Sequence, residues 1–279
     1  MKKTTNKKTI IATITIIATL ATGTISFAAQ HFDGFRELYG EQPNLTAQNK
    51  TVINQSSVVS GVKMTVTESI ISDNGAVIVT TFEKEDGKAF EKDAVVPTIE
   101  ITNRKDLSYM INQVLSEDRT KIIASLEIDS SKSLENQTLT VVADKIINTA
   151  TKETLAAGPW SISFTATNQK FVKEQTIDLL AENDYEKMAL TKINVSSLGV
   201  AVEGKRLDDK TSTLPSYMPS VEITTADGKA IQLTFDSANE IETGFRILYV
   251  NKTDAGIREF LNTSDIKKVS IDGKSITLN

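Results

Sequence analysis

Cysteine is absent from this chain of 279 residues, and histidine occurs only once. The lack of cysteine excludes disulfide bonds, thiolate metal sites and cysteine nucleophiles. The single histidine, His31, lies close to the N-terminus, which argues against a histidine-based triad, general base or zinc site. The Gly-x-Ser-x-Gly elbow and the phosphate-binding glycine loop are absent as well. We therefore predict no catalytic residues, no metal site and no cofactor, and a protein that is not an enzyme.

Basic residues are fewer than acidic residues in this chain. The chain has 31 lysine and arginine residues against 36 acidic ones, a net charge of −5. Without a basic face, nucleic acid is not an expected partner. The hydrophobic fraction of 39% and the charged fraction of 24% are those of a globular protein. The length suits two domains of about 100–150 residues each.

The N-terminal segment sets the expected compartment. Residues 1–8 carry four lysines, and residues 9–30 are uncharged with an apolar centre. Ser26 and Ala28 place small residues before a cut at Ala29, so residues 1–28 are predicted to be a secretory signal peptide. An uncleaved membrane anchor is the alternative, because the uncharged run is about the 20 residues needed to span a bilayer. Either way, the rest of the chain is expected to lie outside the cytoplasm, with the membrane contacted through residues 9–29.

Residues 29–50 are predicted to form a short helix and a linker. Residues 31–40 place four apolar side chains at helical spacing, namely Phe32, Phe35, Leu38 and Tyr39. Two interpretations of this helix stay open: a cap packed on the first domain, or an aromatic contact with the membrane surface. Residues 41–50 are polar and contain Pro43, which indicates a linker.

Residues 51–168 have the pattern of a first β domain. In residues 61–82, apolar and polar side chains alternate up to the turn Ser72-Asp73-Asn74-Gly75, and a β-branched run follows, which predicts a hairpin. Residues 107–115 fit a helix or a strand, and strand is favoured because residues 121–128 look like its return strand. Trp160 is predicted to fill the core rather than to serve as a binding platform. The other expected strands are residues 95–101, with Pro97 suited to a sheet edge, 139–147 and 160–166.

Residues 170–279 repeat this pattern as a second β domain. Asp-Gly pairs at 86–87, 227–228 and 272–273 are typical of type I′ turns, in which both central residues need positive φ. Residues 254–262 are expected to form a helical turn. The fold class predicted is all-β: two Ig-like antiparallel β-sandwich domains, residues 51–168 and 170–279, after an N-terminal signal or anchor helix. The expected strands are residues 176–180, 187–195, 198–203, 221–225, 230–235, 245–250, 269–271 and 275–278.

Two acidic clusters are the remaining candidates for a site. They are Asp208 with Asp209, and Glu182 with Asp184. A calcium loop would need alternating oxygen ligands and a distal glutamate, and neither stretch continues in that way. We therefore predict solvated loops at both places.

Three parts of the chain carry a resemblance to a known family. They are residues 31–40 (HFDGFRELYG), residues 61–79 (GVKMTVTESIISDNGAVIV), and residues 187–205 together with 261–279. They resemble the extracytoplasmic part of bacterial anti-sigma factors of the Bacillus and Clostridium type, an Ig-like domain of unknown function usually followed by a second β domain. Those proteins place a sigma-binding helical domain before the membrane segment. Here only residues 1–8 precede that segment, so no sigma-factor binding is expected from this chain alone.

The resemblance implies the sensor-like outer half of such a regulator. The function expected is that of a non-enzymatic extracytoplasmic protein, secreted or anchored to the bacterial cell membrane by its N-terminal segment. Its role would be sensing, or interaction with an envelope or membrane protein whose identity the sequence leaves open. A structural cell-surface module without a signalling role is the alternative. A carboxylate-based hydrolase is a third hypothesis.

Overall fold

The structure is a computed structural model that describes residues 33–42, 44–45, 50–167, 173–208 and 213–278. The predicted signal peptide or anchor, His31, the expected domain junction at 168–170 and Asp209 lie outside these ranges. Within the described residues, no helix has the length and apolar character needed to cross a membrane. The described residues from Asp33 onward belong to one compact unit. We call residues 33–167 the N-lobe and residues 173–278 the C-lobe.

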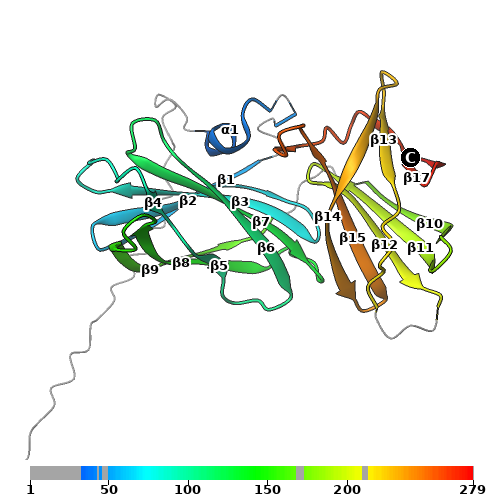
Figure 1. The fold of residues 1–279 in the computed structure, drawn as a ribbon, viewed down its shortest axis with the longest axis horizontal. Coiled ribbons are helices and arrows are strands. Elements are labelled where there is room, and N and C mark those ends of the chain that lie inside the picture. The colour runs from blue at the N-terminus through cyan, green and yellow to red at the C-terminus, as the bar shows by residue number, and fades with distance from the viewer. Residues whose placement is uncertain (1–32, 43, 46–49, 168–172, 209–212, 279) are drawn as a thin grey trace, which may run out of the picture. The chain divides into compact units, whose positions relative to one another are not determined.

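The N-lobe contains two antiparallel sheets (Figure 1). The five-stranded sheet has the order β1-β2-β3-β7-β6. In the four-stranded sheet, β8 pairs with β4, β5 and β9. The strands are β1 (Thr51–Val59), β2 (Val62–Ile71), β3 (Gly75–Lys84), β4 (Ala94–Val95), β5 (Ile99–Ile101), β6 (Leu107–Leu115), β7 (Lys121–Ser130), β8 (Thr138–Asn148) and β9 (Thr154–Thr165).

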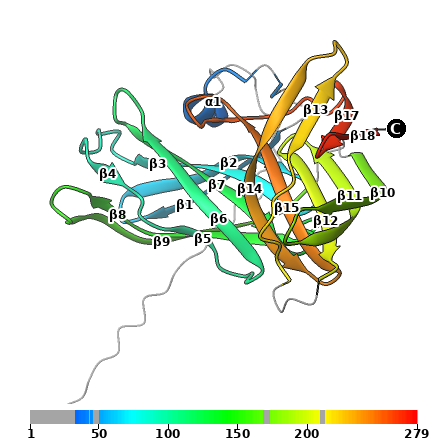
Figure 2. The ribbon, with the colours of Figure 1, turned by 45° about the vertical axis from the view of Figure 1, so that its right-hand side comes forward.

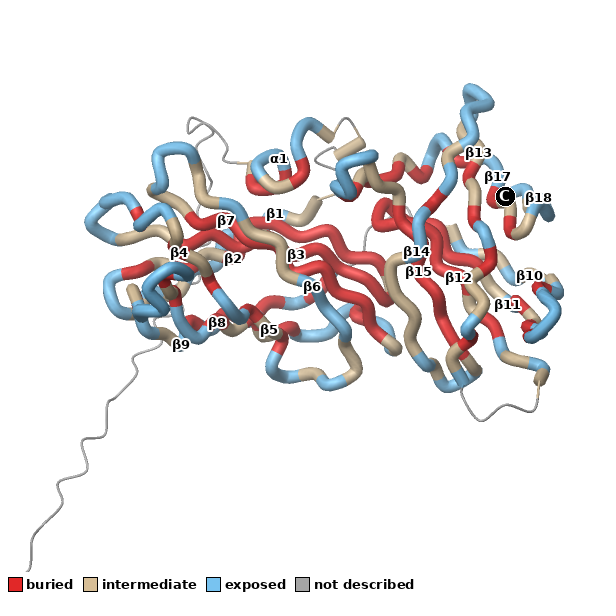
Figure 3. The backbone as a smooth tube through the Cα atoms, viewed as in Figure 1, coloured by how far each residue is buried: buried red, intermediate tan, exposed pale blue. Residues whose placement is uncertain are grey.

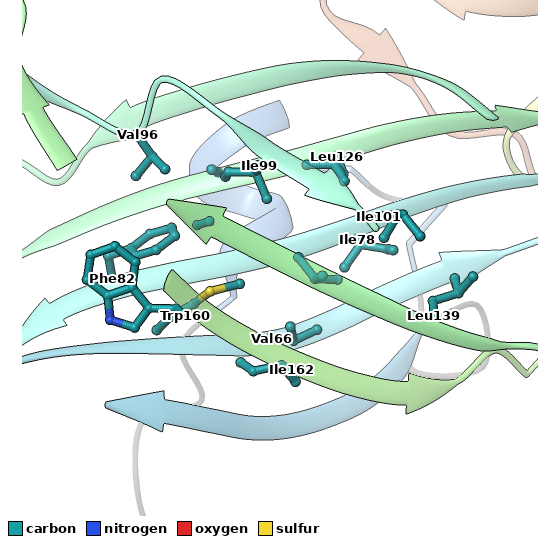
Figure 4. Close-up of a cluster of buried hydrophobic side chains, with 14 of the residues drawn as sticks. Val66, Ile78, Phe82, Val96, Ile99, Ile101, Leu126, Leu139, Trp160 and Ile162 are labelled. Atoms are coloured by element: carbon teal, nitrogen blue, oxygen red, sulfur yellow. The ribbon is translucent and has the colours of Figure 1, made fainter. Parts of the chain in front are cut away.

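The two sheets of the N-lobe enclose one hydrophobic core between them (Figure 4). Trp160 lies in it, fully buried, with its ring edge-on to Phe82 at a centroid distance of 5.7 Å. Its indole N–H donates to the carbonyl of Val62 at 2.8 Å, so the one polar atom of this large side chain is satisfied. The prediction that Trp160 fills the core is confirmed.

The C-lobe is a single nine-stranded sheet that folds over on itself. Its order is β10-β11-β12-β15-β14-β13-β17-β18, with β16 paired to β15. The first part of β14 pairs with β13 and its second part with β15, so this strand belongs to both layers around a second core. The strands are β10 (Lys173–Glu182), β11 (Lys187–Ser196), β12 (Gly199–Arg206), β13 (Val221–Thr225), β14 (Ala230–Ile241), β15 (Gly244–Lys252), β16 (Arg258–Glu259), β17 (Ile266–Ile271) and β18 (Lys274–Thr277).

The predicted all-β fold with antiparallel sandwiches is confirmed, including the hairpin of β2 and β3 and the strand at residues 107–115. Three local predictions were wrong or incomplete. Strand β1 was not expected; Ser60 and Gly61, both at positive φ, join it to β2. The strand at residues 95–101 is divided into β4 and β5, because Pro97 has no N–H for a ladder. Residues 254–262 contain β16 instead of a helical turn, since Arg258 and Glu259 pair with β15.

The Asp-Gly turns differ from one another. At residues 272–273 both φ values are positive, 48° and 76°, as a type I′ hairpin requires. At residues 226–228 only Gly228 has positive φ, and Thr225 N donates to Lys229 O across a three-residue loop. The predicted two-residue turn is therefore wrong there, although β13 and β14 pair as expected.

Replacing Gly228 by valine is expected to lower the free energy of unfolding by about 1–2 kcal/mol, because a β-branched residue is strained at a φ of 86°. Nothing lies within 4 Å of the position of the added Cβ, so the cost comes from the backbone. Gly228→Asn is the matched control and should cost less, because asparagine tolerates this region. Urea denaturation of the three proteins checks the prediction, and equal stabilities of the valine variant and the parent would contradict it.

Candidate functional site: the interlobe cleft and the edge strand β6

The outer face of the five-stranded sheet is buried, although it carries polar residues. Alternate residues of a strand face opposite sides of a sheet. On β7, Leu126 and Ile128 face the core, so Ser125, Glu127 and Asp129 lie on the outer face. All three are buried, and Figure 3 shows buried backbone along the centre of this sheet. A second layer therefore covers this face.

Helix α1 (Gly34–Tyr39) forms part of that layer. The carboxylate of Asp33 accepts from Arg36 N at 3.2 Å and so caps the helix N-terminus. Phe35 and Tyr39 are buried, and the helix lies against β3, β6 and β7. Of the two interpretations left open by the sequence, the structure confirms the cap on the first domain.

The C-lobe segment around Phe260 completes the cover. The Phe260 ring lies edge-on to Phe35 and Tyr39, at centroid distances of 5.6 and 5.2 Å. The amide of Gln42 accepts from Phe260 N and donates to Arg258 O, both at 3.3 Å. Asn44 donates to Phe260 O at 3.0 Å. The segment after α1 thus joins the two lobes through side-chain hydrogen bonds to backbone.

Glu127 is the first of three carboxylates at the contact between the lobes. It accepts from the hydroxyl of Tyr39 at 2.9 Å and from the amide of Asn112 at 2.8 Å. Its other oxygen lies 2.8 Å from Nε of Arg258, a C-lobe residue. Burial raises the pKa of Tyr39 far above its usual value, and the neighbouring Glu127 charge adds to the rise. The Tyr39 hydroxyl therefore keeps its proton and acts as a donor.

Asp129 and Asp236 continue this network across the contact. Asp129 forms a buried ion pair with Arg246 and accepts from Ser237 and Asn239 at 2.5 Å each. Asp236 on β14 binds Nη2 of Arg258 at 2.8 Å and Nζ of Lys252 at 3.0 Å. Each carboxylate thus has several donors. The ion pairs of Glu127 and Asp129 hold the lobes together, whereas those of Asp236 lie within the C-lobe. Carboxylates whose oxygens are all engaged are poorly placed to take a proton from a substrate.

A cleft of about 200 Å³ opens beside this network, between β6 and β7 of the N-lobe and residues of the C-lobe. Sites for drug-sized ligands measure about 300–1,000 Å³. The cleft therefore suits one long side chain better than a whole small-molecule substrate. Its lining residues are Ser108, Tyr109, Met110, Glu127, Ile128, Asp129, Asp236, Ser237 and Arg258.

Strand β6, which forms one wall of this cleft, is an edge strand (Figure 2). Its nine residues, LSYMINQVL, include no charged residue, proline or glycine. Three of its large side chains are exposed: Tyr109 at 42%, Met110 at 48% and Val114 at 38%. Edge strands are usually protected by charges, proline, bulges or a covering segment. By contrast, the edge strand β10 of the C-lobe carries charged residues at both ends and in its middle.

The register shows which backbone groups of β6 face outward. Ser131 N donates to Asp106 O, and Ser116 N donates to Lys121 O, so the even-numbered positions bond to β7. In an antiparallel pair the intervening residues direct N–H and C=O away from the neighbour. Tyr109, Ile111 and Gln113 therefore present their backbone groups at the sheet edge. No backbone group in the described ranges bonds to them there.

An ion pair fixes the chain where β6 begins. Arg104 binds both oxygens of Asp106, and Ser130 Oγ donates to Asp106 at 3.0 Å. The guanidinium of Arg104 lowers the pKa of Asp106 to about 2. Its folded pKa thus lies below its unfolded pKa. The ion pair stabilises the fold fully at pH values above the pKa that Asp106 has in the unfolded chain. This stabilisation is lost as the pH falls through the pKa of Asp106 in the folded protein.

We expect the parent protein to lose about 1–2 kcal/mol more stability between pH 4.5 and pH 2 than the variant Asp106→Asn. This range is discounted for solvent screening, because the Asp106 side chain is 22% exposed. Denaturant titrations at several pH values measure the difference, and the other carboxylates titrate equally in both proteins. Parallel stability curves for the two proteins would contradict the assignment.

Two described members of the acidic clusters considered from the sequence, Asp208 and Glu182, are held in ion pairs. Asp208 binds Arg206 through two hydrogen bonds of 2.8 and 2.7 Å, and Glu182 pairs with Lys187 at 3.1 Å. Across the described residues, no group of three acidic or histidine side chains is arranged to hold a metal. No sequence motif pointed to the other charged residues of this region, which are Glu127, Asp129, Arg246 and Arg258. One signal was present, because Arg246 is a lone charge inside the apolar run of β15.

The fold belongs to the class of all-β proteins built from antiparallel sandwich-type sheets, here with a polar cleft between two lobes. The comparisons found no matching family model and no matching curated protein. Among solved structures, the chain is similar to "The crystal structure of the conserved domain protein from Bacillus anthracis". The TM-score is 0.57 at 16% identity, covering 83% of this chain and 78% of that one. This likeness shows the fold alone, so the resemblance to anti-sigma factor ectodomains stays a prediction.

Proposed function

We propose that this chain is a non-enzymatic interaction protein that works outside the cytoplasm and binds an envelope or membrane protein. The observation that supports this most is the combination of an uncharged, exposed edge strand with a cleft of about 200 Å³. A free sheet edge offers main-chain hydrogen bonds to another polypeptide. A cleft of this size accommodates a side chain of that polypeptide, whereas a substrate pocket is larger.

The contacts made by the cleft carboxylates favour a binding role over a hydrolytic one. A hydrolase of the carboxylate type needs one acid held protonated and another free to act as base or nucleophile. Here Glu127, Asp129 and Asp236 each bind a guanidinium and at least one other donor. These contacts occupy the carboxylate oxygens and hold them in place. Secretion or membrane anchoring by residues 1–28 is part of the same proposal.

Photo-cross-linking in the cells that make the protein tests this function. A benzoyl-phenylalanine residue would replace Met110 on β6, Val58 on β1 or Leu180 on β10, which are all exposed. We expect a specific envelope protein to be captured from at least one position. Recovery of one defined product from repeated experiments supports an interaction role. If none of the three positions yields a defined product, a structural surface module would be the better account.

A further inference from the structure

We infer that a second, smaller cavity between the lobes binds a single ordered water molecule, which joins a turn of the N-lobe to the guanidinium of Arg246. The cavity measures about 10 Å³, close to the minimum volume that holds one water. It shares no lining residue with the larger cleft, so the site is independent of the proposed function. The polar residues that line it are Ser72, Asp73, Asn74, Asn194, Ser196 and Arg246.

The turn between β2 and β3 forms the N-lobe side of this cavity and lies close to the C-lobe. A Cβ added to Gly75 would lie 3.1 Å from Cδ1 of Leu198, a C-lobe residue. Asn74 holds the turn against the end of β7, because its carbonyl accepts from Ser130 N at 2.8 Å and its Nδ2 donates to Ser130 O at 3.2 Å. The turn thereby supplies two kinds of acceptor to the cavity, the amide oxygen of Asn74 and the carboxylate of Asp73.

Arg246 supplies the donors from the C-lobe. Its side chain is only 5% exposed, and its Nη1 binds Asp129. Among the described residues, neither Nε nor Nη2 of Arg246 has a hydrogen-bond partner. Leaving a buried donor unpaired costs free energy, and an ordered water is the usual partner where the surrounding cavity is polar. A water here would accept from the guanidinium and donate to an acceptor on the turn.

The charges of the lining favour a neutral occupant. The guanidinium of Arg246 repels a cation, and the carboxylate of Asp73 repels an anion such as chloride. Water donates and accepts hydrogen bonds, as the lining requires, because it offers donors from Arg246 and acceptors from the turn. The contact between the turn and the C-lobe is therefore hydrated beside Arg246.

Nuclear magnetic resonance of the purified protein tests this site. The guanidinium hydrogens of Arg246 should show cross-peaks to water that have opposite signs in nuclear Overhauser and rotating-frame spectra. A long-lived bound water gives this pattern, whereas chemical exchange with bulk water gives the same sign in both spectra. Cross-peaks of the exchange type alone, or no cross-peaks, would overturn the inference.

Two variants of Ala201 change the room in the cavity. Ala201 is buried and lines it. Ala201→Val adds two methyl groups on a strand, where β-branched residues are favoured, and should abolish the water cross-peaks. Ala201→Gly leaves the room and should keep them. If the valine variant melts well below the parent, Ser196→Val serves instead, with Ser196→Ala as its control. Unchanged cross-peaks in the valine variant would place the water elsewhere and overturn the inference.

A change of salt distinguishes water from a bound ion. Sodium chloride is replaced by sodium sulfate at equal ionic strength, because sulfate is too large for a cavity of about 10 Å³. The guanidinium resonances of Arg246 should stay where they are. A shift confined to Arg246 and the turn would mean that chloride occupies the cavity, and the inference would be wrong. Neither result bears on β6 or on its cross-linking experiment.

Discussion

Replacing Arg246 by methionine is expected to lower the free energy of unfolding by about 3–5 kcal/mol. The side chains of Arg246 and Asp129 are each only 5% exposed, and they form an ion pair between the lobes. Methionine would leave the charge of Asp129 buried with neutral donors only, those of Ser237 and Asn239. A buried charge that has lost its counter-ion is far more costly than a lost surface pair. Urea denaturation followed by tryptophan fluorescence and circular dichroism measures the loss.

A double variant shows how much of this loss comes from the pair itself. Asp129→Asn with Arg246→Met removes both charges, so its destabilisation should be smaller than the sum of the two single changes. Lys88→Ala is the control, because Lys88 pairs with Asp86 at an exposed position and should leave stability unchanged. If Arg246→Met unfolds at the same urea concentration as the parent, the buried pair does not couple the lobes.

Replacing Phe35 by alanine is expected to cost about 3–5 kcal/mol as well, but by loss of packing. Phe35 is 1% exposed and contacts Tyr39 and Phe260, so its ring belongs to the layer that covers the outer face of the sheet. The remaining cavity should loosen α1 and expose β7 residues. Hydrogen exchange of the β7 amides, together with the melting temperature, measures both effects.

The neighbouring residue provides the control for Phe35. Arg36 is largely exposed and pairs with Glu41 at the surface, so Arg36→Ala should change neither the melting temperature nor exchange on β7. Faster exchange in both variants would mean that the ring of Phe35 is not what holds the cover in place. A Phe35→Ala variant with unchanged stability would show that α1 is dispensable for the sheet.

Local patterns in the sequence predicted much of this fold. The hairpin of β2 and β3 follows from alternation on both sides of a turn. The turn types were harder to predict, because Asp-Gly supports a two-residue loop at 272–273 and a three-residue loop at 226–228. The number of loop residues depends on where the flanking ladder ends. The position of that end is set by the partner strands.

The site could not be predicted, for a different physical reason. Polar residues at alternate positions of β7 are typical of a face in water. Only the tertiary contacts with α1 and the C-lobe bury Glu127 and Asp129. Likewise, strand β6 has an ambiguous pattern, and its position at the sheet edge depends on the strand order. Long-range contacts of this kind leave little trace in one sequence, apart from the lone arginine in β15.

The central claim is that β6 presents a free sheet edge, and amide hydrogen exchange of the protein alone tests it most directly. The account predicts that the amides of Met110, Asn112 and Val114 are protected by β7. It also predicts that those of Tyr109, Ile111 and Gln113 exchange rapidly, because they face the solvent. An alternating pattern along β6, measured by NMR, would support the claim. Uniform protection of all six amides would contradict it, because another segment or another copy would then already occupy the edge.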